Sequence, residues 1–155
     1  MRNGPGMIPR SLATLFRQWG LAAVVAPQAL RGQGGYYVLL LRVPASRIKI
    51  GVMGPLRLAA GLYGYVGSAR GRSVTLGHRL ARHMRRRKVR HWHIDYLTTA
   101  PAVTMLGAYW TADPTMTETG LAIRCAERFP VIRRFGNADV RGGAPGHLFF
   151  LAPER

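Results

Sequence analysis

The sequence predicts a small α+β domain in which a mostly antiparallel sheet is flanked by helices. Its length of 155 residues suits one domain, and the 48% of apolar residues is enough to form a hydrophobic core. Short runs of β-branched and aromatic residues, separated by glycine and proline, are typical of strands. Two further stretches have the periodicity of helices.

The first 34 residues are expected to form a flexible N-terminal appendage outside this domain. They lead into Arg31-Gly32-Gln33-Gly34-Gly35, a sequence typical of a flexible junction. Residues 9–26 are compatible either with a short amphipathic helix or with no stable structure. The folded domain is therefore expected over residues 35–152.

The strands of the domain are predicted from apolar runs bounded by turn residues. These runs are residues 36–43, 62–66, 103–110 and 148–151. Two more runs, residues 47–52 and 56–60, flank Met53-Gly54-Pro55 and predict a hairpin.

Two helices are predicted from apolar residues that recur about every four positions. The first covers residues 74–88, with Leu76, Leu80 and Met84 as its apolar stripe, and the second covers residues 117–129 and stops at Pro130. Residues 91–98 alternate in a way that fits either a strand or a short helix.

The charge of the chain predicts a polyanionic partner. The chain has 23 Lys and Arg against 6 Asp and Glu, a net charge of +17, and no acidic residue precedes Asp95. Nucleic acid is the commonest partner that offsets such self-repulsion, because each neutralised phosphate releases a counterion. A general preference for arginine is the alternative, although it does not explain the absence of acids.

The single cysteine, Cys125, excludes an internal disulfide. No apolar run is long enough to span a membrane, and the clean apolar piece at residues 21–27 is too short for a signal peptide. We therefore expect a cytoplasmic protein with no membrane partner.

Arg79 and His83 stand out within the first helix. They lie four residues apart beside the apolar stripe, so both side chains can point at one ligand atom, and the guanidinium fork suits a phosphate. Two tyrosines in each of two strands accompany them, among several glycines: Tyr36, Tyr37, Tyr63 and Tyr65. Tyrosines on strands are also commonly packing residues.

Glu118 is the carboxylate that the second helix turns inward. Leu121, Ala122, Cys125 and Phe129 fall within about 60° of it on a helical wheel, whereas Glu127 falls at about 180°. We expect Glu118 to be buried and to need a cationic partner. A capping box from Thr115 to Glu118 is the competing explanation.

Together these residues resemble the motifs of the GIY-YIG nuclease superfamily. The motifs are Gly35-Tyr36-Tyr37, Tyr65-Val66-Gly67-Ser68-Ala69, Arg79-Leu80-x-x-His83 and the downstream Glu118. The hairpin between the tyrosine motifs, His91-Trp92-His93-Ile94-Asp95-Tyr96 and Gly146-His147-Leu148-Phe149 are similar to the small stand-alone Uri-type endonucleases. The resemblance covers residues 35–151.

The resemblance implies an endonuclease that hydrolyses a phosphodiester, with DNA favoured over RNA as substrate. It implies one Mg²⁺ or Mn²⁺ ion on Glu118, Tyr37 or Tyr65 as proton acceptor from water, and Arg79 as stabiliser of the transition state. His83 would orient the water or the phosphate. Further nucleic-acid contacts are expected from Arg72, Arg82, Arg86, Lys88, His91 and His93, and polar support around the site from Ser68 and Asn137.

Two other functions remain open at this point. A non-catalytic nucleic-acid-binding module would use the same basic helix and aromatic strands. A structural zinc site would use His78, His83, His91, His93 and Cys125, although their spacing is not typical of zinc ligands.

Overall fold

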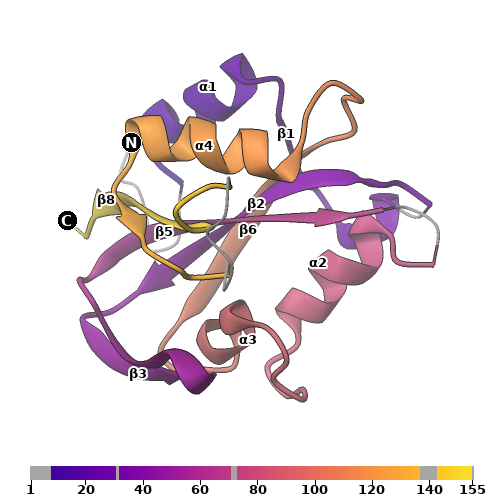
Figure 1. Cartoon of the computed structure of the whole chain (residues 1–155). Helices are drawn as coiled ribbons and strands as arrows, with labels where there is room; N and C mark the ends of the chain where they lie inside the picture. The colour runs from indigo at the N-terminus through magenta and orange to yellow at the C-terminus, as the bar shows by residue number, and fades with distance from the viewer. Residues whose placement is uncertain (1–7, 31, 71–72, 137–142, 155) are drawn as a thin grey trace.

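A six-stranded antiparallel sheet forms the centre of the protein, with helices on both of its faces (Figure 1). The structure is a computed structural model and describes residues 8–30, 32–70, 73–136 and 143–154. The strand order is β1-β6-β2-β5-β8-β7. The α+β fold class predicted from the sequence is therefore confirmed.

The strands of this sheet are β1 (Ala22–Ala23), β2 (Gly35–Val43), β5 (Gly61–Ala69), β6 (Thr104–Thr111), β7 (Val131–Ile132) and β8 (Leu148–Pro153). The helices are α1 (Arg10–Gln18), α2 (Leu76–Met84), α3 (His93–Thr98) and α4 (Glu118–Arg128), with short 3-10 turns η1 (Pro27–Leu30) and η2 (Gly51–Met53). A separate hairpin consists of β3 (Ser46–Ile50) and β4 (Gly54–Leu58).

Each face of the sheet carries its own hydrophobic core. In Figure 1, α1 and α4 lie above the sheet, while α2, α3 and the hairpin lie below it. Strand β2 serves both cores, because Tyr37, Leu39 and Leu41 point to the α2 side and Val38 and Leu40 to the α4 side. This double burial explains why residues 36–43 read as a continuous apolar run.

Residues 8–30 lie within this fold rather than outside it as an appendage. Leu12 and Phe16 of α1 are buried in the core beneath α4, and β1 extends the sheet beside β6. Leu30 reaches the other core, beside α2. The part of the first 34 residues that the structure describes thus contributes to both faces, because its apolar side chains cover sheet surface that would otherwise be exposed.

Helix α2 is shorter than the predicted 74–88. It ends at Met84, which is more than half exposed. The prediction that Met84 belongs to the buried apolar stripe is therefore wrong. Arg85 already has an extended backbone, and the Lys88 ammonium donates to the carbonyl oxygens of Arg82 and His83. Consecutive cations repel along a helix, and this lysine satisfies carbonyls that the next turn would have used.

The predicted hairpin is confirmed, and residues 91–98 contain the short helix α3 rather than a strand. The buried side chains of both elements, Ile50 and Leu58 of the hairpin and Ile94 and Leu97 of α3, join the same core. No helix in the described part of the chain combines the length and hydrophobicity needed to cross a membrane.

Candidate functional site

A pocket of about 450 Å³ opens where the ends of β2 and β5 meet α2 and the start of α4. Tyr37, Tyr65, Arg79, His83 and Glu118 all line it. The side chains expected from the sequence to act together are therefore brought together, from two strands and two helices far apart in the chain.

Gly67 makes room for the first of these side chains. It pairs with Tyr37 across the antiparallel strands β2 and β5. A Cβ atom on Gly67 would overlap the hydroxyl oxygen and ring of Tyr37. A glycine in this strand position thus lets the phenol cross the neighbouring backbone and reach the pocket.

The Tyr37 hydroxyl oxygen lies 2.6 Å from His83 Nε2. Burial, followed by the charge of Lys88, lowers the pKa of His83 to about 3, so its imidazole is neutral near pH 7. Since no other acceptor for the phenol is present among the described residues, we assign the bond as Tyr37 O–H donating to Nε2. The imidazole proton then lies on Nδ1.

Both phenols in the pocket hold their protons tightly. Burial, and next the neighbouring Tyr65, raise the pKa of Tyr37 well above its usual value. Burial and the negative charge of Glu118 likewise raise the pKa of Tyr65. The Arg79 cation opposes these shifts only in part, so the two hydroxyls act as hydrogen-bond donors rather than as phenolates.

Trp92 positions Arg79 in the pocket. The guanidinium carbons of Arg79 and Arg82 lie 4.4 Å and 4.5 Å from the centroid of the Trp92 ring. Asp95, fully buried, accepts hydrogen bonds from both Nη atoms of Arg82, at 2.6 Å and 3.0 Å, and from the backbone N–H of Trp92. Asp95 thereby holds the indole on which Arg79 rests.

Trp92 and Asp95 were not among the site residues expected from the sequence. Both belong to the His91–Tyr96 motif, which was used only as a mark of family likeness. The acidic side chain inside a basic region was the available signal, because a buried carboxylate requires a cationic partner.

Two buried polar atoms beside the pocket lack a hydrogen-bond partner among the described residues. They are Arg79 Nε and His83 Nδ1. Buried N–H groups are nearly always paired in proteins, so two adjacent exceptions need an explanation. A pocket that accepts an anionic ligand supplies one, since such a ligand brings acceptor oxygens.

Glu118 lies on the rim of the pocket and is only partly buried, with 39% of its side chain exposed. The expectation of full burial is wrong because Glu118 is the first residue of α4, where the helix leaves the sheet. The capping-box alternative is wrong as well, since Thr117 is the N-cap and accepts the N–H of Gly120. Its carboxylate is thus free of the capping role.

The Glu118 carboxylate is steadied from two sides. Ser68 Oγ donates to Oε2 at 3.1 Å, as expected for a polar support. His147 Nδ1 lies 3.8 Å from Oε1 and 3.2 Å from the carbonyl oxygen of Val66. His147 was missed as a site residue, although the Gly146–Phe149 motif containing it was noticed.

The donor set around Glu118 limits which metal ion the pocket can hold. In the described ranges, no three His, Cys, Asp or Glu side chains gather as metal ligands. A structural zinc site needs four such ligands, whereas Mg²⁺ is often held by one carboxylate, substrate oxygens and water. One half-exposed carboxylate supported by Ser68 fits Mg²⁺ or Mn²⁺ better than zinc.

Three basic residues expected to contact nucleic acid are instead tied to the protein. Arg82 is bound to Asp95, Arg86 Nη1 donates to the carbonyl oxygens of Ala100 and Val103, and Lys88 caps α2. Internal acceptors therefore engage these three cations, and their expected contact with phosphate stays a prediction.

The remaining expected residues lie near the pocket or outside the described residues. His93 Nδ1 accepts the N–H of Gly136, a residue of the pocket wall, and His91 is exposed. Neither histidine lines the pocket. Arg72 and Asn137 lie outside the described residues.

Comparison with known proteins gives a family but no activity. A family model described as a domain of unknown function, DUF123, matches residues 36–155. No curated protein and no solved structure matches the chain. The matched range contains every pocket residue named above.

Proposed function

We propose a function from the premise that the chain belongs to the DUF123 family, whose description states none. The protein is a metal-dependent endonuclease that hydrolyses phosphodiesters in nucleic acid, with DNA favoured over RNA. The resemblance of its motifs supports a place among the GIY-YIG nucleases and, within them, among the small Uri-type enzymes. The observation that carries the proposal is the meeting of Tyr37, Tyr65, Arg79, His83 and Glu118 in one pocket.

The Tyr37–His83 pair serves as a proton acceptor for the attacking water. Because His83 is neutral and accepts the phenol proton at Nε2, Tyr37 can take a proton from water while passing its own to the imidazole. The raised pKa of Tyr37 argues against a free phenolate as the base. The negative charge of a bound phosphate favours the imidazolium that results.

Arg79 and Tyr65 bind the phosphate on which the water acts. The guanidinium of Arg79 is held against Trp92, and its Nε–H has no partner among the residues that the structure describes. The protonated Tyr65 hydroxyl adds a second donor within the same pocket. Oriented donors of this kind stabilise charge that grows in the transition state without having to move.

Glu118, supported by Ser68, would hold one Mg²⁺ or Mn²⁺ at the rim of the pocket. The ion would supply positive charge that stabilises the leaving oxygen. The carboxylate also balances the surrounding cations, and its partial exposure leaves its remaining lone pairs open to solvent.

Nicking of supercoiled plasmid tests this proposal. The wild-type chain should nick plasmid with Mg²⁺ or Mn²⁺ and stop when EDTA is added. Arg79→Ala should lower the rate by about two to three orders of magnitude, as for loss of one oriented donor. Arg85→Ala is the matched control, because Arg85 is an exposed arginine just beyond the same helix.

The outcome also separates the proposal from a passive nucleic-acid-binding module. A chain that binds DNA tightly but leaves plasmid intact at every metal concentration would be such a module. Equal nicking by wild type and Arg79→Ala would point to a contaminating nuclease, and the proposal would then be abandoned.

A further inference from the structure

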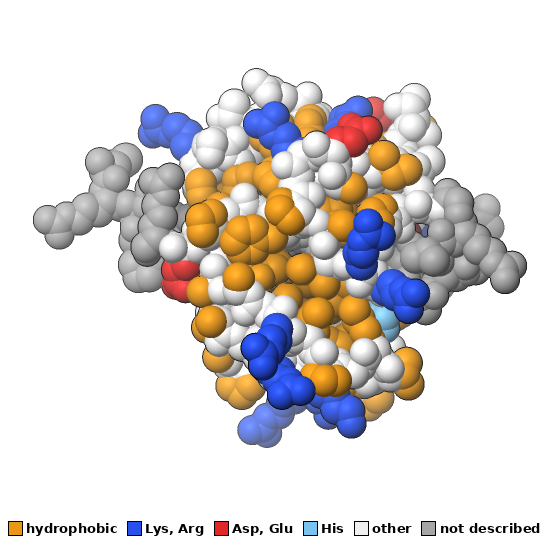
Figure 2. All heavy atoms as spheres, turned by 60° about the vertical axis from the view of Figure 1, so that its left-hand side comes forward, with side chains coloured by type: hydrophobic (Ala, Val, Ile, Leu, Met, Phe, Trp, Pro, Cys, Tyr) orange, Lys and Arg blue, Asp and Glu red, His pale blue; other side chains and the backbone are white. Residues whose placement is uncertain are grey.

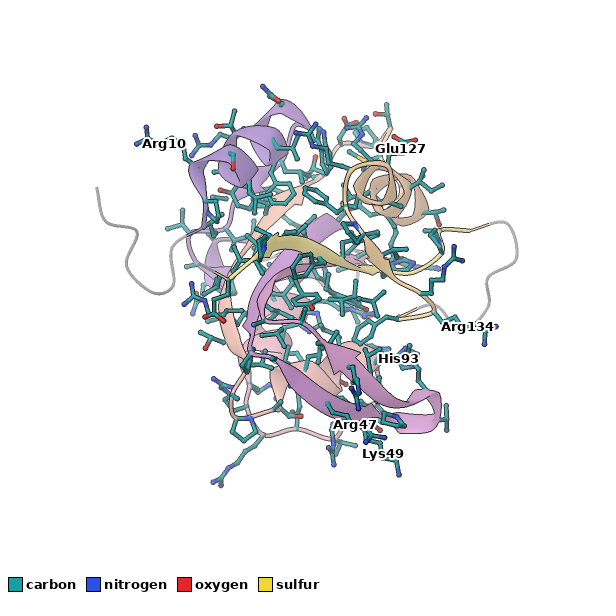
Figure 3. The ribbon with its side chains drawn as sticks, turned by 90° about the vertical axis from the view of Figure 1, so that its left-hand side faces the viewer. Arg10, Arg47, Lys49, His93, Glu127 and Arg134 are labelled. Atoms are coloured by element: carbon teal, nitrogen blue, oxygen red, sulfur yellow. The ribbon has the colours of Figure 1, made fainter. Side chains whose placement is uncertain are left out.

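A row of basic residues, in which the arginines and the lysine carry the charge, leads away from the pocket over the β3–β4 hairpin. Figure 3 shows Arg134, His93, Arg47 and Lys49 along one side of the molecule. The hydrogen bond from Gly136 to His93 joins the start of this row to the pocket wall. The row is therefore continuous with the site where a phosphate is proposed to bind.

The outward face of the hairpin is basic because basic and apolar residues alternate along its two strands. Arg47, Lys49 and Arg57 are exposed, while Ile48, Ile50 and Leu58 on the other face pack into the core. Arg47 lies directly opposite Arg57 in the antiparallel register. Like charges in such a position destabilise a hairpin, and no carboxylate of the described residues pairs with either of them.

Arg134 is a second cation in an unfavourable structural setting, in this case an unfavourable backbone conformation. It has a φ of 65° and is the only residue other than glycine with a positive φ among those described. Its backbone N–H is fixed to the carbonyl oxygen of Pro145, and its side chain is exposed. Glycine or asparagine would adopt this conformation more easily, so a binding role for the cation explains why arginine stands here.

We infer that the outward face of the β3–β4 hairpin binds the phosphate backbone of a DNA duplex beside the strand that enters the pocket. This inference rests on the proposed nuclease function and specifies its substrate as double-stranded. Figure 2 shows a group of Lys and Arg side chains at the lower end of the molecule, where the hairpin lies, with Asp and Glu sparse on that face.

The shape of the hairpin selects the duplex among nucleic acids. Residues 46–58 contain no aromatic side chain, whereas surfaces that bind single strands stack bases on aromatic rings. A two-stranded ribbon fits the wide major groove of B-form DNA, and the major groove of an RNA helix is too narrow to be reached. The exposed Val52 at the hairpin turn can approach the groove without a charge to desolvate.

Binding in EDTA tests the inference independently of cleavage. The assay is fluorescence anisotropy of a labelled 24-base-pair DNA, its single strand and the matching RNA duplex. The test variant replaces Arg47, Lys49 and Arg57 with alanine. The control variant replaces Arg10, Arg17 and Arg128, which are also exposed, so both variants lose three positive charges. Arg10 lies at the opposite end of the molecule from Lys49 (Figure 3).

The hairpin variant should bind duplex DNA at least about tenfold more weakly. The slope of the logarithm of its binding constant against the logarithm of salt concentration should become less steep by about 2 to 3. The control should change affinity by less than about threefold. Lys49→Glu alone should weaken duplex binding more than Arg10→Glu does. Thermal unfolding checks that the hairpin variant is folded. Its unfolding temperature should be unchanged or higher, because the repulsion between Arg47 and Arg57 is removed.

Equal losses in the two triple variants would overturn the inference, and so would a loss confined to the single strand or to RNA. In either case plasmid nicking by the wild type would leave the proposed function standing. A selective loss of duplex binding in a chain that never nicks plasmid would support the hairpin as a DNA-binding surface and refute the nuclease.

Discussion

Replacing Gly67 with alanine should inactivate the site without unfolding the domain. The new methyl group would overlap the hydroxyl and ring of Tyr37. Tyr37 is almost fully buried and its hydroxyl is bonded to His83, so the ring cannot turn aside without losing that bond. We expect the unfolding free energy to fall by about 1–3 kcal/mol, as for overpacking of a core.

The catalytic effect should be larger than the effect on stability. A shift of about 1 Å in a reacting group can lower a rate about 100-fold, so Gly67→Ala should nick plasmid at least that much more slowly. Gly64→Ala is the control on the same strand. Its methyl group would press on the side chains of Leu151 and Val38 at 3.1 Å, and not on Tyr37. Its nicking rate should stay within a few-fold of wild type.

A double variant decides whether Gly67 acts through Tyr37. Tyr37→Phe alone should be slow because it lacks the proton-transfer group. If the reasoning holds, Gly67→Ala/Tyr37→Phe should be no slower than Tyr37→Phe, since both changes remove the same hydroxyl from its place. The reasoning is refuted if the rate losses of the two single variants multiply in the double variant. It is also refuted if Gly64→Ala is as inactive as Gly67→Ala.

Three more predictions concern the network behind the pocket. Asp95→Asn should lower the unfolding free energy in urea by about 3–5 kcal/mol, because it leaves the Arg82 guanidinium without its buried counter-charge. Trp92→Ala should reduce the nicking rate about tenfold while Trp92→Phe keeps most of it, since an aromatic face still supports Arg79. Because the pKa of His83 is lowered to about 3, the unfolded chain binds a proton between about pH 6.5 and 3 that the folded chain does not. As the pH is lowered across that window, the unfolding free energy should therefore decrease by up to about 1.4 kcal/mol per pH unit. His83→Gln should remove this part of the pH dependence of stability.

Local patterns were enough to predict most elements of the fold. The period-2 and period-4 runs place β2, β5, β6, β8, the hairpin and α4 within a few residues of their observed ends, while the two-residue strands β1 and β7 were not predicted. What local patterns cannot supply is the end of α2, because Lys88 satisfies carbonyls that lie behind it in the chain. The place of residues 8–30 was hidden for a different reason: their partners, β6 and α4, come about 100 residues later.

The members of the candidate site were largely visible in the sequence, but their environments were not. The helical wheel correctly turned Glu118 towards the sheet, yet it could not show that α4 begins there and leaves the carboxylate on the rim. The charge pattern likewise marked Arg82 and Arg86 as nucleic-acid contacts without showing which internal groups bind them. Their acceptors, Asp95 and two backbone carbonyls, become neighbours only through the packing of α3 against α2.

The most direct test of the proposed phosphate and metal site compares two glutamates of one helix. Glu118 lines the pocket, whereas Glu127 is exposed on the outer side of α4 (Figure 3). The measurement is the rate of plasmid nicking over a Mn²⁺ titration for Glu118→Gln and Glu127→Gln. The account predicts a loss of at least about 100-fold for Glu118→Gln and none for Glu127→Gln. Nicking by Glu118→Gln at the wild-type rate and with the same Mn²⁺ dependence would contradict it.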